Sequence, residues 1–219
     1  MRIDLPVAGA EAVRTDEDER ARELAALHAR ILACRACERA GDVAEARPVR
    51  HPWTPRQRTL VVGQAPGAQT HARRYHFAGP GGKLLERWFA AAGFEPGTWR
   101  DRCYITALTR CFPGKNPRGN GDRRPSPAEL SRCRPFLDAE LALVPAGAIV
   151  PVGTMAIEFF LGRRPLDAVV GRTFDLNGRR VIPLPHPSGV SRWLNDAANQ
   201  RLVERAVEHL AAARVELGL

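Results

Sequence analysis

Apolar residues along the chain alternate between short continuous runs and longer stretches in which they recur every three or four positions. The continuous runs are rich in β-branched residues and predict strands, whereas the spaced stretches predict helices with one buried face. Strands are expected at 58–63, 103–111, 146–153 and 179–186. Helices are expected at 16–34, 81–94, 127–143, 154–162 and 195–217.

This alternation of strands with helices predicts an α/β fold. The strands are apolar throughout, which favours a parallel sheet that helices cover on both faces. Residues 1–16 are expected to form a flexible N-terminal arm, and residues 17–219 are long enough for a single domain with its own core. Ser126, Pro127 and Glu129 have the spacing of a capping box and predict the start of the third helix.

Three loops of unusual composition follow predicted strands. GQAPG (63–67), RCFPG (110–114) and HPSG (186–189) would meet at the carboxyl edge of a parallel sheet, where ligands bind in such folds. Glycine and proline in the first loop allow close approach to a ligand, although an ordinary strand-to-helix turn would also explain them. Because this loop has neither the G-x-G-x-x-G nor the Walker pattern, a dinucleotide or nucleoside triphosphate site is not expected.

The net charge of +9 and the pI near 10.3 favour a polyanionic partner such as DNA, RNA, an anionic membrane surface or an acidic protein. An arginine-rich composition without functional meaning is the alternative, because Lys83 and Lys115 are the only lysines. The chain has no long apolar run, so neither a membrane span nor a secretory leader is expected. We therefore expect a cytoplasmic protein that does not bind a membrane, associated with the nucleoid if DNA is its partner.

Five cysteines in a cytoplasmic chain favour metal or cluster binding over disulfides. Cys34 and Cys37 form a C-x-x-C pair at the end of the first predicted helix, Cys111 opens a long basic loop, and Cys133 lies in the helix that closes it. Four such thiolates could hold zinc or an iron–sulfur cluster. Cys103 falls within a predicted strand and is expected to be a buried thiol.

Four blocks of the sequence, in the same order, resemble motifs of the iron–sulfur uracil-DNA glycosylases of families 4 and 5. VVGQAPG is similar to their GEAPG motif, and YHFAGPGGKLLERW is similar to their PFVGxAGxLL stretch. CFPGKNPRGNGDRRPSPAELSRCRPFL is similar to their CRPP…PTPEE…CRPYL segment, and HPSG matches their HPS loop. The resemblance covers roughly residues 30–215 and implies a three-layer α/β/α sandwich around a central four-stranded parallel sheet.

The resemblance also implies the site residues. The ligands of a [4Fe–4S] cluster would be Cys34, Cys37, Cys111 and Cys133. The base pocket would be lined by Gly63, Gln64, Ala65, Pro66, Gly67, Phe77, Ala107 and Ser188, with the Phe77 ring stacked on the flipped base. The catalytic residues would be Gln64 and His186, and the histidine would hydrogen-bond the base O2 as negative charge develops there. Val190 would fill the vacated base stack, with Arg192 and Trp193 beside it.

The activity that the resemblance implies is that of a monofunctional uracil-DNA glycosylase, a hydrolase of base excision repair that leaves an abasic site. A base within a duplex must be extruded before its glycosidic bond can be cleaved. The expected partners are double- and single-stranded DNA containing uracil or another deaminated base. The basic-loop residues Lys115, Arg118, Arg123 and Arg124 are expected to contact DNA phosphates. We expect a monomer, and Trp193 could equally pack on the core at the start of the last helix.

Three positions depart from the families. Gln64 replaces the family 4 glutamate, Ala107 replaces the family 4 asparagine that reads the uracil edge, and Pro80 replaces a family 5 aspartate. Without a carboxylate there, water would be held by Gln64 and the backbone, or by His71 or His76, and the substrate range could be wider than uracil. A non-catalytic or weakly catalytic damaged-DNA-binding protein and a zinc-stabilised nucleic-acid module are the alternatives.

Overall fold

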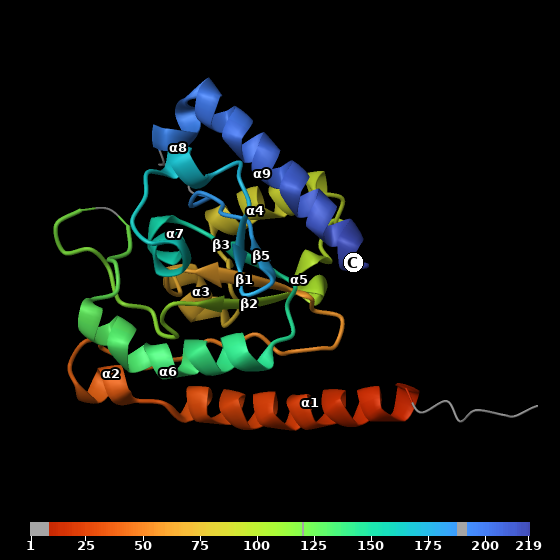
Figure 1. Cartoon of the computed structure of the whole chain (residues 1–219). Coiled ribbons are helices and arrows are strands. Elements are labelled where there is room, and N and C mark those ends of the chain that lie inside the picture. The colour runs from red at the N-terminus through yellow and green to blue at the C-terminus, as the bar shows by residue number, and fades with distance from the viewer. Residues whose placement is uncertain (1–8, 120, 188–191) are drawn as a thin grey trace, which may run out of the picture.

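The computed structural model describes residues 9–119, 121–187 and 192–219, with side chains described from residue 16 onward (Figure 1). The strands are β1 (Thr59–Gly63), β2 (Cys103–Ala107), β3 (Ala148–Pro151), β4 (Phe174–Leu176) and β5 (Arg179–Val181). The longer helices are α1 (Gly9–Ala33), α4 (Pro80–Ala91), α6 (Pro127–Leu143), α7 (Thr154–Leu161) and α9 (Ala197–Glu216). The short ones are α2 (Ala36–Arg39), α3 (Ala68–Arg73), α5 (Trp99–Arg102), α8 (Leu166–Val169) and the 3-10 helix η1 (Arg192–Asn195).

The described strands form a mixed sheet in the order β2-β1-β3-β5-β4. The first four strands of this order are parallel, and β4 pairs antiparallel with β5. The prediction of a four-stranded, wholly parallel sheet is therefore wrong, because a hairpin adds a fifth strand at the edge. Asn177 and Gly178 form the turn of this hairpin, and both have a positive φ, 54° and 77°, as a type I′ turn requires.

Helices cover both faces of the sheet, as the sequence predicts for an α/β fold (Figure 1). On one face, Val61 and Val150 belong to a core shared with α4 and α9. On the other face, Leu60 and Ile149 belong to a second core shared with α1 and α6, which run side by side. Neighbouring residues of one strand thus point into different cores. This burial of both faces explains why the parallel strands are apolar throughout.

Two boundaries differ from the expected ones. The α1 helix begins at Gly9, inside the segment expected to be a flexible arm, because good helix formers without a proline follow that residue. The β2 strand ends at Ala107, because the next amide, that of Leu108, turns to donate to the Gly63 carbonyl oxygen at 2.9 Å. None of the described helices is long and apolar enough to cross a membrane.

Candidate functional site

The carboxyl ends of β1 and β2 bring the first predicted site residues together. Gly63 and Ala107 are register partners on these strands. Beyond them, the amide of Leu108 donates to the Gly63 oxygen at 2.9 Å, and the amide of Thr109 donates to the Gln64 oxygen at 3.3 Å. The backbone of the GQAPG loop is therefore held against the end of β2, and Gly63, Gln64 and Ala107 share one edge of the sheet.

Phe77 lies over the end of β1. A Cβ atom placed on Gly63 would meet the Phe77 ring at 3.4 Å, so the glycine leaves the space beside which this ring packs. The ring is half-buried, and its centroid lies 6.4 Å from that of Trp99. The backbone of Phe77 is left-handed, with a φ of 54°, which few non-glycine residues adopt. The ring and the GQAPG loop thus lie on the same side of the site.

His186 follows the last parallel strand and lies beside Gly153. Gly153 has a φ of 89°, and a Cβ atom there would lie 3.3 Å from the His186 Cβ. The carbonyl oxygen of Pro187 is 2.7 Å from where a Cβ of Gly81 would be, so this loop abuts the start of α4. Although the His186 residue is exposed, desolvation by the surrounding protein lowers the pKa of its imidazole below the usual value. The ring is therefore neutral at neutral pH and has one N–H to donate.

The other predicted pocket and wedge residues do not all lie at the sheet edge. Residues 65–67 connect β1 to α3 at the same edge of the sheet. Ser188 and Val190 lie outside the described residues. Arg192 is exposed, whereas Trp193 is half-buried and packs against the core. Trp193 also lines a hollow of about 1050 Å³ between α8 and α9, which includes no other predicted site residue, so its packing favours a structural role.

The basic loop folds back as a small hairpin beside the GQAPG loop. Lys115 and Asp122 form an isolated antiparallel bridge, and the Lys115 ammonium pairs with the Asp122 carboxylate at 2.8 Å. The second oxygen of this carboxylate accepts from the amide of Ala68 at 3.1 Å. Asp122 therefore joins the loop to the start of α3, while Lys115 and Arg118 stay exposed.

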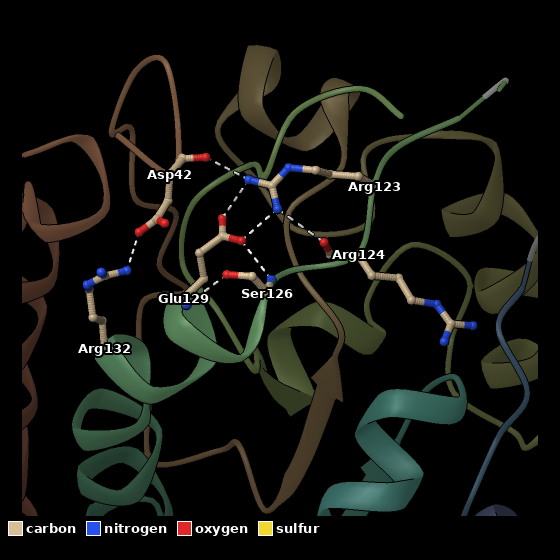
Figure 2. Close-up of polar contacts among 6 residues, drawn as sticks. All are labelled: Asp42, Arg123, Arg124, Ser126, Glu129 and Arg132. Carbon is tan, nitrogen blue, oxygen red and sulfur yellow. Dashed lines mark hydrogen bonds and ion pairs between the residues drawn. The ribbon is translucent and has the colours of Figure 1, made fainter. Parts of the chain in front are cut away.

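Arg123 is engaged within the protein (Figure 2). Its guanidinium donates to both carboxylate oxygens of Glu129, at 2.6 and 3.0 Å, and to the carbonyl oxygen of Asp42 at 2.6 Å. Glu129 is only 3% exposed. The exposed side chain of Arg124 points away from this group in Figure 2. The geometry therefore supports a phosphate contact for Arg124 but a structural role for Arg123.

These contacts belong to a polar clamp, which consists of Asp42, Arg123, Ser126, Glu129 and Arg132 (Figure 2). The Glu129 carboxylate accepts from the Ser126 amide at 2.7 Å, and the Ser126 hydroxyl accepts from the Glu129 amide at 3.2 Å, which confirms the predicted capping box. Arg132 pairs with the Asp42 carboxylate. Burial alone would raise the pKa of Glu129, but hydrogen bonds from Arg123 and Ser126 lower it below its usual value. An ionised, buried carboxylate thus links the segment after α2 to α6.

Four of the five cysteines gather beside this clamp. Cys37 and Cys111 share a small buried cluster. Burial, together with the nearby thiols of Cys133, Cys37 and Cys34, raises the pKa of Cys111 to about 12. Cys103 instead lies in the core that faces α4 and α9, where burial raises the pKa of its thiol. Among the described residues, no three His, Cys, Asp or Glu side chains are placed to share one metal ion.

The sequence profile of the uracil DNA glycosylase superfamily matches residues 52–211. The chain belongs to this superfamily. A type-4 uracil-DNA glycosylase of Thermotoga maritima is 31% identical over 138 residues, which are 62% of this chain and 67% of that protein. One of Archaeoglobus fulgidus is 28% identical over 171 residues, 73% of this chain and 79% of that protein. A type-5 uracil-DNA glycosylase of Thermus thermophilus is 31% identical over 157 residues, 60% of this chain and 68% of that protein.

The family inferred from the four sequence blocks is thus confirmed at the level of the uracil DNA glycosylase superfamily, and so is the expected enzyme class. Several residues that shape this candidate site are absent from the sequence prediction. Gly81 and Gly153 make room for the His186 loop, but nothing in their local sequence indicates a distant neighbour. Asp122 had a usable signal, because it is the one acidic residue in the basic loop 111–125.

A buried ion pair at the end of β2 is a further feature that the sequence does not predict. Arg110 and Glu140 pair at 2.5 Å, with side chains only 2% and 1% exposed. Glu140 also accepts from the hydroxyls of Tyr104 at 2.9 Å and Thr106 at 2.6 Å, and Arg110 donates to the Ala107 carbonyl. Because buried charges persist only when they are paired and hydrogen-bonded, this network fixes the end of β2. In the sequence, Arg110 falls near the end of the strand expected at 103–111, and nothing local indicates its buried partner.

Proposed function

We propose that this superfamily member extrudes uracil from double- or single-stranded DNA and hydrolyses the N-glycosidic bond, which leaves an abasic site. The observation that carries this proposal is the neutral imidazole of His186 at the same sheet edge as the half-buried Phe77 ring and the GQAPG loop. A leaving-group donor, an aromatic platform and a glycine-lined approach are the parts that base extrusion and excision need. The uracil-DNA glycosylase names of the relatives support the same substrate.

His186 is assigned to the departing base. When the glycosidic bond breaks, its electron pair goes to the base, and negative charge builds on the base O2. A neutral imidazole N–H directed at O2 stabilises this charge as it develops, without a proton transfer. Because the contact strengthens only as charge builds, it raises the rate of bond cleavage more than it tightens ground-state binding.

The attacking water is assigned to the Gln64 side chain and the backbone of its loop. Residues 64 and 65 are glutamine and alanine, so the loop supplies no carboxylate. His76 is 5% exposed, and burial lowers its pKa to about 3, so it is a poor proton acceptor. The Nε2 atom of His71 lies 3.6 Å from the Glu45 carboxylate, so this ring nitrogen already faces a partner within the protein. We therefore assign the positioning of the water to Gln64 and to neither histidine, and the proton that the water loses on adding to the sugar passes to solvent.

The cysteine group of Cys34, Cys37, Cys111 and Cys133 is assigned to a [4Fe–4S] cluster with a structural role. These thiols come from three separate segments, and neighbouring thiols of the group contribute to the raised pKa of Cys37, Cys111 and Cys133. The resemblance of the segment from Cys111 to Leu137 to the iron–sulfur uracil-DNA glycosylases favours a cluster over zinc. When bound, the cluster would cross-link α2, the start of the basic loop and α6.

DNA contact is assigned to the exposed charges beside the pocket. Lys115, Arg118 and Arg124 are exposed on the basic loop, and Arg192 is exposed at the start of η1. Guanidinium and ammonium groups so placed neutralise phosphates and release counterions on binding. Ala107 has no side-chain amide with which to read the uracil edge, so hypoxanthine, xanthine and mismatched thymine are further candidate substrates.

The second candidate function is a damaged-DNA-binding protein of the same fold with little turnover, which the missing carboxylate in the GQAPG loop favours. Single-turnover release of free base separates the two. Labelled oligonucleotides would carry uracil, hypoxanthine, xanthine or thymine opposite each normal base. Release of free uracil with formation of an abasic site supports the glycosylase. Tight binding of uracil-containing duplex without release would instead support the binding protein.

A further inference from the structure

The backbone conformation of Phe77 needs support from its surroundings. Its φ of 54° is left-handed, a region in which the Cβ of a non-glycine residue crowds the carbonyl oxygen. Among the described non-glycine residues, Arg74 and Asn177 also have a positive φ, but they lie at the end of α3 and in the β4–β5 turn. Phe77 lies at the proposed base pocket instead. Strained backbone at such a site persists only when neighbouring residues over-determine it.

The carbonyl oxygen of Phe77 is held by residues of α4 and α5. A Cβ atom on Gly82, in the first turn of α4, would lie 1.8 Å from this oxygen, so only glycine allows the helix to pack there. The guanidinium of Arg100, on α5, donates to the same oxygen at 3.4 Å. Gly82 therefore leaves room for the left-handed backbone of Phe77, and Arg100 binds its carbonyl oxygen.

Arg100 is itself fixed by its neighbours. Its guanidinium pairs with the Glu86 carboxylate at 3.1 Å and lies 4.5 Å above the ring of Trp99. Glu86 also accepts from the indole N–H of Trp99 at 2.5 Å and from the Gly97 amide at 2.7 Å. The donor to Phe77 is therefore preorganised, since its position does not depend on the Phe77 contact alone.

We propose that Arg100 is a positioning residue for base recognition: by binding the Phe77 carbonyl oxygen, it holds the backbone that places the Phe77 ring beside Gly63. This inference rests on the proposed stacking of Phe77 on the flipped base. Arg100 acts through Phe77, and a ring displaced by about 1 Å loses much of the alignment on which catalysis depends. Glu86 and Trp99 hold the guanidinium, and Gly82 provides the space.

A structural experiment tests the positioning directly, without DNA. The protein is labelled with ¹³C-phenylalanine, and the Phe77 resonances are assigned as those lost in Phe77→Ala. Arg100→Met should move the Phe77 Cα and Cβ shifts away from their left-handed values, and Arg100→Lys should move them less. The control is Arg102→Met, at the other end of the same helix, which should leave them unchanged. Unchanged Phe77 shifts in Arg100→Met would overturn the proposal, whatever the enzyme does to uracil.

A double-mutant cycle tests the functional consequence. Single-turnover uracil release should slow by about 10-fold in Arg100→Met, with no further slowing when the same change is made in Phe77→Ala. A loss of thermal stability should appear in both backgrounds, which separates the packing of Arg100 from its effect through Phe77. Rate losses that multiply in the double variant would overturn the proposal. Failure of the wild-type protein to release uracil would count against the proposed function, and the Phe77 shifts would still decide the role of Arg100.

Discussion

Replacing Arg123 distinguishes a clamp residue from a phosphate contact. In Arg123→Met, the Glu129 carboxylate keeps its hydrogen bond from the Ser126 amide but loses two charge-assisted bonds and its counter-charge. Because Glu129 is 3% exposed, the unpaired charge would stay buried, which costs roughly 3–5 kcal/mol. Arg123 itself is 27% exposed, so water can partly replace it, and we expect the lower end of that range. A loss of about 3 kcal/mol corresponds to a fall in Tm of roughly 6–12 °C for a chain of this size.

Thermal unfolding and salt-dependent DNA binding together test this expectation. Arg124→Met is the matched control, because Arg124 is the exposed neighbour outside the clamp. It should leave Tm nearly unchanged, weaken binding to damaged and undamaged duplex alike, and reduce the slope of log K against log salt by about 1. Arg123→Met should lower Tm and leave that slope intact. In a double-mutant cycle, Glu129→Gln should cost less stability when Arg123 is already absent.

The reverse result would refute the clamp. If Arg123→Met unfolds within about 2 °C of the wild type while its salt slope flattens by about 1, the guanidinium serves DNA phosphates as the sequence suggested. The buried carboxylate would then be satisfied by the Ser126 amide alone.

Three further predictions concern other parts of the molecule. His186→Ala should slow single-turnover base release by about 100-fold while barely changing affinity for uracil-containing duplex. If the variant releases base at the wild-type rate, His186 does not stabilise the leaving group. Replacing any one of the four cysteines of the cysteine group by serine should lose visible absorbance and soluble protein, whereas Cys103→Ser should keep both; the opposite pattern in absorbance spectra would show that the ligand set is wrong. Burial lowers the pKa of His28 and of His51 to about 4 and that of His76 to about 3. The folded chain therefore keeps these rings neutral while the unfolded chain protonates them below about pH 6.5, so Tm should fall as pH drops from about 6.5 toward 4, and a flat Tm over that range would contradict this account.

The strands and the edge at which the site forms could be predicted because a continuous apolar run is a local signal. The β4–β5 hairpin had a local signal too, in Asn177-Gly178, but its flanking strands are three residues long and only partly buried. Runs this short, in which apolar and polar residues are mixed, do not give a recognisable strand pattern in the sequence. The start of α1 is not predicted for the opposite reason: residues 9–16 have helical propensity, but they have no apolar stripe that indicates a packed helix.

The candidate site likewise contains residues that a local sequence signal predicts and residues whose role depends on distant partners. Sequence blocks located Gly63, Phe77 and His186, because each stands in a motif whose neighbours are adjacent in the chain. The role of Arg123 could not be predicted, because every arginine of a basic loop looks alike in sequence. Its partner Glu129 is only 6 residues away, but its second partner, Asp42, is 81 residues away. Pairing of a charge depends on tertiary neighbours, which composition and spacing do not record.

The polar clamp also sets an order of events during protein synthesis. The bond from Arg123 to the Asp42 carbonyl joins residues 81 positions apart, and the Arg132–Asp42 pair joins residues 90 positions apart. Closing so long a loop costs chain entropy, which contacts at both ends must offset. On the ribosome, Cys34 and Cys37 emerge well before either arginine has been made. Until α6 has been synthesised, the polar clamp cannot form beside Cys34 and Cys37. During that time oxidants or soft metal ions can reach these two thiols of the nascent chain.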